Sequence, residues 1–308
     1  MTSHSADRQH ALLLGSMMDI LVCGKSGQLA KALAREPKGF QWHFAGRDEL
    51  DLADAESMER TLTRYNFDLL INAAAYTQVD AAEQESDRAM AINGEAPGIL
   101  AELCERKGAA LMHFSTDYVF GNERNTPALE DDSLAPLGVY GLSKLHGEEA
   151  LRAACSKHFI VRTSWLYGVD GKNFVKTMLQ LAGSRKQLNV VYDQIGSPTF
   201  VDDLARACLS MAEHYEQRRE GSAFGTYHFS NEGVASWYDF AEAIFAMSGV
   251  DIELQPVRSS AFPTPAQRPP YSVLDKQKIK DTFGVSIRHW RLALADCLDK
   301  LKMPGHED

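Results

Sequence analysis

The sequence of 308 residues has few cysteines, no basic excess and no long apolar run. Its cysteines are odd in number and form no Cys-x-x-Cys pair, which disfavours a disulfide framework and a zinc ribbon. They are Cys23, Cys104, Cys155, Cys208 and Cys297. No group of histidines or carboxylates has the spacing of metal ligands, so no metal site is predicted. We expect reduced thiols and a cytoplasmic location.

The charge balance and the lack of apolar runs exclude further classes of protein. Lys and Arg number 32 against 42 Asp and Glu, a net charge of -10, whereas a nucleic-acid-binding protein needs a basic surface. No apolar run approaches the roughly 18–20 residues that cross a bilayer, so no membrane partner is expected. Residues 1–17 lack the features of a signal peptide. We predict that they form an N-terminal extension outside the fold.

Apolar and amphipathic segments alternate from Asp19 to Thr163. Continuous apolar runs of this length are typical of strands that are buried on both faces of a parallel sheet. We expect strands at 19–23, 41–45, 69–73, 109–114 and 158–162, and helices at 55–65, 81–106 and 139–154. This alternation predicts an α/β fold with a Rossmann-type, doubly wound parallel sheet.

The second half of the chain has a looser pattern. Helices are expected at 173–182, from about 201 and at 236–247, strands at 188–192 and 227–230, and a proline-rich loop at 262–271. We predict a smaller, partly interleaved C-terminal α/β lobe that binds the substrate. The dinucleotide-binding domain would comprise residues 18–164 and about 199–231, and the lobe about 165–198 and 232–308. The cleft between them is the expected ligand site.

A glycine-containing turn follows the first expected strand, in the pattern Gly24-x-x-Gly27-x-x-Ala30. Glycines let the backbone turn tightly and approach a diphosphate, which then lies at the N-terminus of the next helix. The order strand, turn, helix favours a dinucleotide site over an ordinary tight turn.

Arg47 follows the second expected strand, where an acidic residue would hold the ribose 2′-hydroxyl of NAD. An arginine at this point suits the 2′-phosphate of NADP, so NADPH is favoured and NADH remains an alternative. A solvent-exposed arginine without a ligand is the other interpretation. Asp51 and Leu52 lie a few residues later, where they could contact the adenine.

Tyr140 and Lys144 are one turn apart on an expected helix, so they share one face. An ammonium group beside a phenol stabilises the phenolate and brings the pKa of the tyrosine towards neutrality. Thr116, at the end of an expected strand, could hydrogen-bond a carbonyl oxygen that becomes an alkoxide. The three residues together predict the reduction of a carbonyl group.

These motifs resemble those of the extended short-chain dehydrogenases/reductases. The narrower resemblance is to the dTDP-4-dehydrorhamnose reductase family, over nearly the whole chain. It rests on the glycine turn, Tyr140-x-x-x-Lys144 and the segments 72–75, 75–80, 115–121, 162–168, 173–179 and 262–269. The last segment, Phe262-Pro-Thr-Pro-Ala-Gln-Arg-Pro269, is the most specific to this family.

The resemblance implies roles for individual residues. Tyr140 would donate the proton, Lys144 would assist it and anchor the ribose, and Thr116 would orient the carbonyl. Residues expected at the cofactor are Gly24, Gly27, Gln28, Leu29, Arg47, Asp51, Leu52, Ala73, Ala74, Tyr118, Tyr140 and Lys144. Residues expected at the substrate are Val79, Asp80, Trp165, Asn173 and Arg268.

The resemblance also implies an activity. NADPH would reduce C4 of dTDP-4-dehydro-6-deoxy-L-mannose to give dTDP-L-rhamnose for surface polysaccharide. The alternatives are a reductase of different stereochemistry or substrate, and a non-catalytic nucleotide-binding regulatory subunit. An acidic residue found near Ala32 in some relatives is missing, which leaves a dimer-bridging magnesium ion uncertain; a homodimer is left open.

Overall fold

The computed structural model describes residues 17–36 and 39–303, so residues 1–16 of the expected extension lie outside the described residues. Six parallel strands form its central sheet in the order β10-β5-β4-β3-β1-β2. They are β1 (Met18–Cys23), β2 (Phe40–Ala45), β3 (Leu69–Asn72), β4 (Ala110–Thr116), β5 (His158–Thr163) and β10 (Gly225–Phe229). The chain passes from β1 to β2 on one side and then to β3 on the other. In such sheets a ligand-binding crevice forms at the carboxyl ends of the strands, at the point where the strand order reverses direction.

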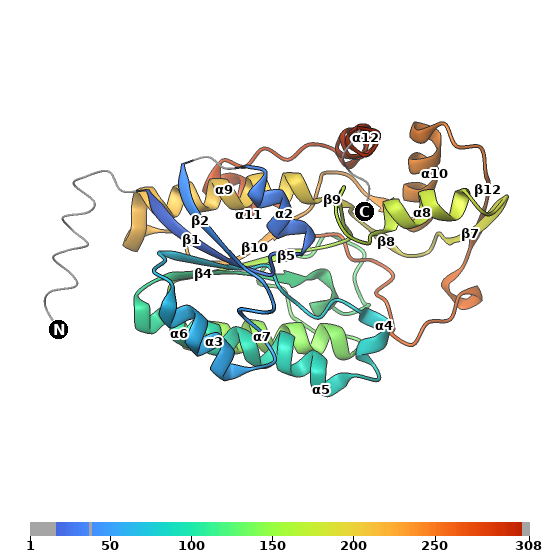
Figure 1. Cartoon of the computed structure of the whole chain (residues 1–308). Helices are drawn as coiled ribbons and strands as arrows, with labels where there is room; N and C mark the ends of the chain where they lie inside the picture. The colour runs from blue at the N-terminus through green and yellow to red at the C-terminus, as the bar shows by residue number, and fades with distance from the viewer. Residues whose placement is uncertain (1–16, 37–38, 304–308) are drawn as a thin grey trace, which may run out of the picture.

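Helices cover both faces of this sheet (Figure 1). One layer contains α2 (Gln28–Ala34), α9 (Val201–Arg218) and α11 (Gln277–Phe283), and the opposite layer contains α3 (Ala55–Arg64), α6 (Ala96–Lys107) and α7 (Val139–Ala154). Alternate residues of β1 serve the two layers: Ile20 and Val22 pack towards α2 and α9, whereas Leu21 and Cys23 pack towards α3 and α6. Burial on both faces explains the continuous apolar runs in the sequence.

The single helix expected at 81–106 is wrong in detail. The segment is divided into α4 (Val79–Ala82), α5 (Ser86–Ala89), a π-helical stretch (Met90–Glu95) and α6. Pro97, near the start of α6, has no N–H to donate to the Asn93 carbonyl, and its ring would clash with that carbonyl in a regular helix. The Asn93 carbonyl lies instead against α7, where a Cβ on Gly147 would overlap it. The π-helical stretch thus lets α7 pack closely against it.

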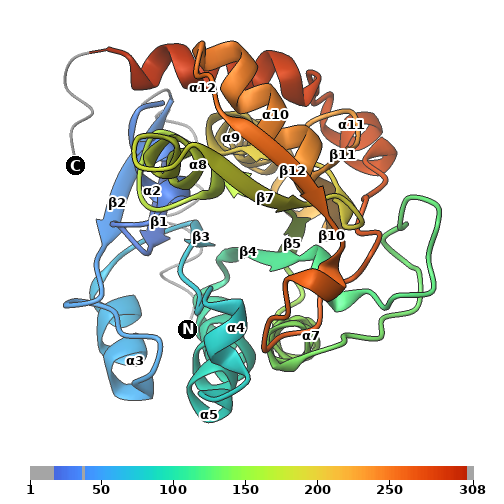
Figure 2. The ribbon, with the colours of Figure 1, turned by 90° about the vertical axis from the view of Figure 1, so that its right-hand side faces the viewer.

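A smaller lobe lies beside one end of the central sheet, at the right in Figure 1 and towards the viewer in Figure 2. Its strand pairs are β6 (Leu166–Tyr167) with β9 (Thr199–Phe200), β7 (Gln187–Val191) with β12 (Glu253–Val257), and β8 (Ile195–Gly196) with β11 (Ala235–Ser236). Its helices are α8 (Phe174–Ala182), α10 (Trp237–Ser248) and α12 (Trp290–Leu301), which share one apolar core. Short 3-10 turns lie at Asp117–Val119, Arg219–Gly221 and Ser259–Ala261.

The two parts are interleaved along the chain. After β6, α8 and β7, the chain returns to the central sheet with α9 and β10, and then re-enters the lobe. The α/β class and the parallel sheet predicted from the sequence are confirmed by this arrangement. The division into two domains with the bounds given above stays a prediction.

Candidate active site

A cavity of about 790 Å³ lies at the carboxyl ends of β1, β3, β4 and β5 and extends to the smaller lobe. Most of the residues singled out in the sequence line it. They are Gly24, Gly27, Gln28, Leu29, Arg47, Asp51, Leu52, Ala73, Ala74, Val79, Thr116, Tyr118, Tyr140, Lys144, Trp165 and Arg268. Asp80 and Asn173 are not among the lining residues.

The glycine turn has the geometry that the motif requires. Gly24 has a φ of +87°, and a Cβ there would lie 3.0 Å from Ala74, so only glycine fits. The backbone N–H groups of Gly24 and Lys25 both donate to the carbonyl of Ala45 at the end of β2, which fixes the turn between β1 and α2. Gly27 is the N-cap of α2 and has no side chain to cap it. The turn therefore presents to the cavity an uncapped helix start, with no side chain at Gly24 or Gly27.

Arg47 lies at the rim of the cavity and is exposed. Its Nε is 3.3 Å from Asp51 Oδ2, while Asp51 Oδ1 accepts from the Ala53 N–H. The hydrogen bond from Ala53, followed by that from Arg47, lowers the pKa of Asp51. The guanidinium thus keeps a hydrogen-bonding edge within reach of a ligand in the cavity.

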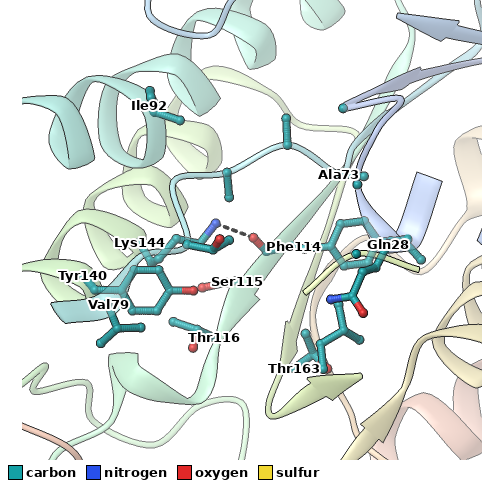
Figure 3. Close-up of a pocket in the computed structure, with 18 of the residues that line it drawn as sticks. Gln28, Ala73, Val79, Ile92, Phe114, Ser115, Thr116, Tyr140, Lys144 and Thr163 are labelled. Atoms are coloured by element: carbon teal, nitrogen blue, oxygen red, sulfur yellow. Dashed lines mark hydrogen bonds between the residues drawn. The ribbon is translucent and has the colours of Figure 1, made fainter. Parts of the chain in front are cut away.

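Tyr140 and Lys144 point from α7 towards the end of β4, where Ser115 and Thr116 lie (Figure 3). The start of α7 contacts this strand end closely, since a Cβ on Gly141 would overlap the Tyr118 carbonyl oxygen. Thr116 donates to Asp117 Oδ1 at 2.9 Å and accepts from the Tyr118 N–H at 3.2 Å. Its hydroxyl is therefore held at the cavity wall beside the phenol.

Burial dominates the electrostatics of this pair. It raises the pKa of Tyr140 to about 12, and a hydrogen bond with Thr116 only partly opposes it. It lowers the pKa of Lys144 to about 8, against the attraction of Glu148. The Lys144 amine donates to the Phe114 carbonyl at 2.6 Å (Figure 3). The expected lowering of the Tyr140 pKa is thus not found in this structure, and the phenol stays protonated at neutral pH.

A buried ion pair anchors α7 to the central sheet. Glu148, one turn beyond Lys144, accepts two hydrogen bonds from Arg162 of β5, at 2.8 and 2.7 Å. Both side chains are essentially inaccessible to solvent. Because the guanidinium fork fixes the carboxylate in two places, the rotation of α7 relative to β5 is fixed as well.

Trp165 lines the part of the cavity nearest the smaller lobe. Its φ of +47° is unusual for a bulky residue, and its ring stacks on Trp237 with centroids 3.5 Å apart. A Cβ on Gly196 would lie 2.7 Å from the Trp165 ring, so a glycine is needed there. The strained backbone and the stacked partner together hold an indole face at the cavity.

Trp237 and Lys172 are lining residues that the sequence analysis missed. Trp237 opens α10, directly after the capping residue Ser236, and nothing in that local pattern indicates a ligand. Lys172 precedes Asn173 in a loop. Only the folding of the smaller lobe brings these side chains to the cavity.

Arg268 and Asp80 form a bidentate ion pair, with N–O distances of 3.0 and 2.7 Å. The hydrogen bond to Arg268 lowers the pKa of Asp80. Asp80 therefore positions Arg268, which lines the cavity, and joins the proline-rich loop to α4. Asn173 caps α8 and donates to Gln28 Oε1 at 3.1 Å, so it too acts through a lining residue.

Among residues 17–36 and 39–303, no group of three or more His, Cys, Asp or Glu side chains could hold a metal ion. In the same part of the chain, no helix is both long and apolar enough to cross a membrane. The magnesium ion and the homodimer that the sequence analysis left open are not tested by these observations.

The comparisons with known proteins identify the family of this chain. A family model described as the RmlD substrate binding domain matches residues 18–303. The chain is also 38% identical to the dTDP-4-dehydrorhamnose reductase of Burkholderia thailandensis, over 92% of this chain and 99% of the relative. The chain belongs to this reductase family. The resemblance inferred from its motifs is thereby confirmed.

Two further relatives extend the comparison. The spore coat polysaccharide biosynthesis protein SpsK of Bacillus subtilis is 41% identical, over 92% of this chain and 98% of the relative. The structure of the dTDP-4-dehydrorhamnose reductase of Bacillus anthracis in complex with NADP has a TM-score of 0.86 and 35% identity, covering 92% of this chain and all of that chain.

Proposed function

We propose that the protein reduces the C4 ketone of dTDP-4-dehydro-6-deoxy-L-mannose with NADPH and yields dTDP-L-rhamnose. The observation that carries the proposal is that Tyr140, Lys144 and Thr116 line the same cavity as the glycine turn at Gly24. The family membership and the reductases named above support it.

The residues at the turn fit a dinucleotide. Any side chain at Gly24 would meet Ala74, and the uncapped start of α2 offers backbone N–H donors to a diphosphate. When bound, NADPH supplies the hydride. Arg47 would contact the 2′-phosphate, because a guanidinium matches phosphate oxygens in pairs. The NADP bound by the relative from Bacillus anthracis supports this preference.

Tyr140 donates its hydroxyl proton to the C4 oxygen as that carbon gains a hydride, so the ketone becomes a secondary alcohol. A phenol that burial keeps protonated suits a proton donor in this direction. Thr116 turns its hydroxyl hydrogen from Asp117 to the same oxygen, and Lys144 stabilises the phenolate that remains. The proton returns to Tyr140 from solvent before the next turnover.

The smaller lobe would hold the nucleotide sugar. Trp165, supported by Trp237, offers an apolar face to the deoxysugar ring, and Arg268 offers paired donors to the diphosphate. Val79 lines the same cavity. All five cysteines are buried and unpaired, which supports a reducing, cytoplasmic setting for the reaction.

A coupled assay tests the proposal. An upstream dehydratase and epimerase generate the 4-keto sugar nucleotide, NADPH oxidation is followed by absorbance, and NMR gives the configuration of the product at C4. We expect stoichiometric oxidation and dTDP-L-rhamnose. A 6-deoxy-talose product would indicate the reductase of opposite stereochemistry. NADPH binding without turnover would indicate the regulatory subunit.

A further inference from the structure

His113 is a buried residue of β4 that the proposed reaction does not use. Its ring lies between two side chains. Nδ1 is 3.1 Å from Asn72 Nδ2, and Nε2 is 3.4 Å from the Lys144 amine. All three side chains are at most 2% exposed, so water does not compete for these contacts.

The contacts of Asn72 determine where the ring carries its proton. Asn72 Oδ1 accepts from the Ala74 N–H at 3.3 Å, which turns Nδ2 towards His113. An amide Nδ2 can only donate, so Nδ1 must accept, and a neutral ring then carries its hydrogen on Nε2. This hydrogen faces Lys144.

The interaction of Lys144 with this hydrogen depends on whether its amine is protonated. An ammonium group has three donors and no acceptor, so it would oppose the Nε2–H, whereas a neutral amine accepts it. The Phe114 carbonyl takes one amine hydrogen in either form. Burial, followed by the Lys144 charge, lowers the pKa of His113 well below its usual range, so the ring stays neutral. The negative charge of Glu148 on α7 raises the pKa of Lys144 and so favours its charged form.

We propose that Asn72 and His113 form a positioning pair for Lys144, in which Asn72 fixes the ring tautomer and the Nε2–H of His113 hydrogen-bonds the neutral amine. The pair therefore competes with protonation of Lys144 and helps to set the alkaline limit of its charged form. This inference deepens the proposed function and rests on the role given there to Lys144.

The tautomer can be observed directly in the wild-type full-length protein. Long-range 1H–15N spectra distinguish Nε2–H, Nδ1–H and imidazolium rings, and the His113→Gln variant assigns the signal. We expect the Nε2–H form from pH 5.5 to 9. An Nδ1–H ring or an imidazolium at pH 7 would overturn the proposal. This result does not depend on any sugar substrate, so it separates failure of the positioning pair from failure of the proposed function.

His113→Gln also tests the consequence for Lys144, because an amide oxygen at this position can accept from an ammonium group. The alkaline limit of kcat/KM should rise by about one pH unit, which is tenfold in the proton equilibrium. His158→Gln is the matched control, since His158, the first residue of β5, contacts the Cys155 carbonyl and not Lys144. If the folded His113→Gln variant keeps the wild-type limit, the proposal fails. If the variant does not fold, the tautomer observed in the wild-type protein is the test of the proposal.

Discussion

Two bidentate ion pairs support the walls of the cavity, and they differ in burial. The pair of Glu148 with Arg162 is almost inaccessible and joins α7 to β5. The pair of Asp80 with Arg268 is 41% and 21% exposed and joins α4 to a loop. The reacting groups thus lie on rigid, buried elements, whereas the groups for the nucleotide sugar lie on short strands and loops. Substitutions should therefore lower activity or stability strongly at the buried elements that carry the reacting groups, and only mildly at the loops that carry the sugar-binding groups.

The largest effect is expected at the reacting edge. Tyr140→Phe removes the proton donor and should lower kcat by about 10²–10⁴-fold, the usual contribution of general acid catalysis. NADPH binding, measured by fluorescence titration, should change little. Tyr65→Phe is the control, because it removes a phenol that donates to Glu49 outside the cavity. Equal activity of the two variants would exclude Tyr140 as the donor.

Glu148→Gln leaves the Arg162 guanidinium buried without its counter-charge. Removing one partner of a buried pair typically costs about 3–5 kcal/mol, and we expect a loss of this size in the free energy of unfolding. Urea denaturation followed by circular dichroism measures it. A loss below about 1 kcal/mol would show that the buried side is not the rigid one.

Low pH should reduce the stability of the buried region around Arg162. His228 contacts Arg162 at 3.4 Å, and burial, helped by Arg162, lowers its pKa to about 3. Between this value and the ordinary pKa of about 6.5, the unfolded chain binds a proton that the folded chain does not. Stability is therefore full above pH 6.5 and falls below it, by up to about 1.4 kcal/mol per pH unit for this one group.

Urea denaturation at pH 7, 6 and 5 tests this pH dependence. The buried His113 adds to the slope, because its pKa is lowered too. His228→Gln should reduce the slope of stability against pH by the contribution of one titrating group. An unchanged slope in this variant would show that His228 does not couple folding to pH.

At the cofactor rim, Arg47→Ala should weaken NADPH binding about tenfold, or about 1.4 kcal/mol, and leave NADH binding unchanged. The reason is that only NADPH carries the 2′-phosphate that this guanidinium would contact. The ratio of the two dissociation constants is the measurement. A parallel loss for both cofactors would assign Arg47 a role in the fold instead.

The smallest effect is expected for the exposed pair. Asp80→Asn should cost less than about 1 kcal/mol of stability, as is usual for partly exposed ion pairs. It should raise KM more than it lowers kcat, because Arg268 loses its support at the substrate side. Comparison with Glu148→Gln under identical conditions shows how unequal the two pairs are. A larger loss for Asp80→Asn would reverse the comparison.

Local patterns in the sequence were sufficient for the parts of the site that strand ends carry. Gly24 and Thr116 each follow or end a buried strand, and the topology of a parallel sheet brings such ends together. Tyr140 and Lys144 followed from helical spacing taken together with the strand end at Thr116 and the glycine turn. The catalytic and binding roles of these residues stay predictions, but their places in one cavity could be expected.

Other features depend on tertiary structure and left no local signal. Asp80 and Arg268 are 188 positions apart, and only the folded loop pairs them. Trp237 reaches the cavity because Trp165 stacks on it, and Pro97 gave no indication by itself that the preceding turn would be π-helical. The lower pKa expected for Tyr140 failed for the same reason, since burial cannot be read from spacing.

The two glycines of α7 matter for redesign. Carbonyl oxygens of Tyr118 and Asn93 occupy the space that a side chain at Gly141 or Gly147 would need. Even alanine at either position would push α7 away from the segment that it contacts there and carry Tyr140 away from its partners. New specificities are better sought by varying the loops of the smaller lobe while this helix is kept intact.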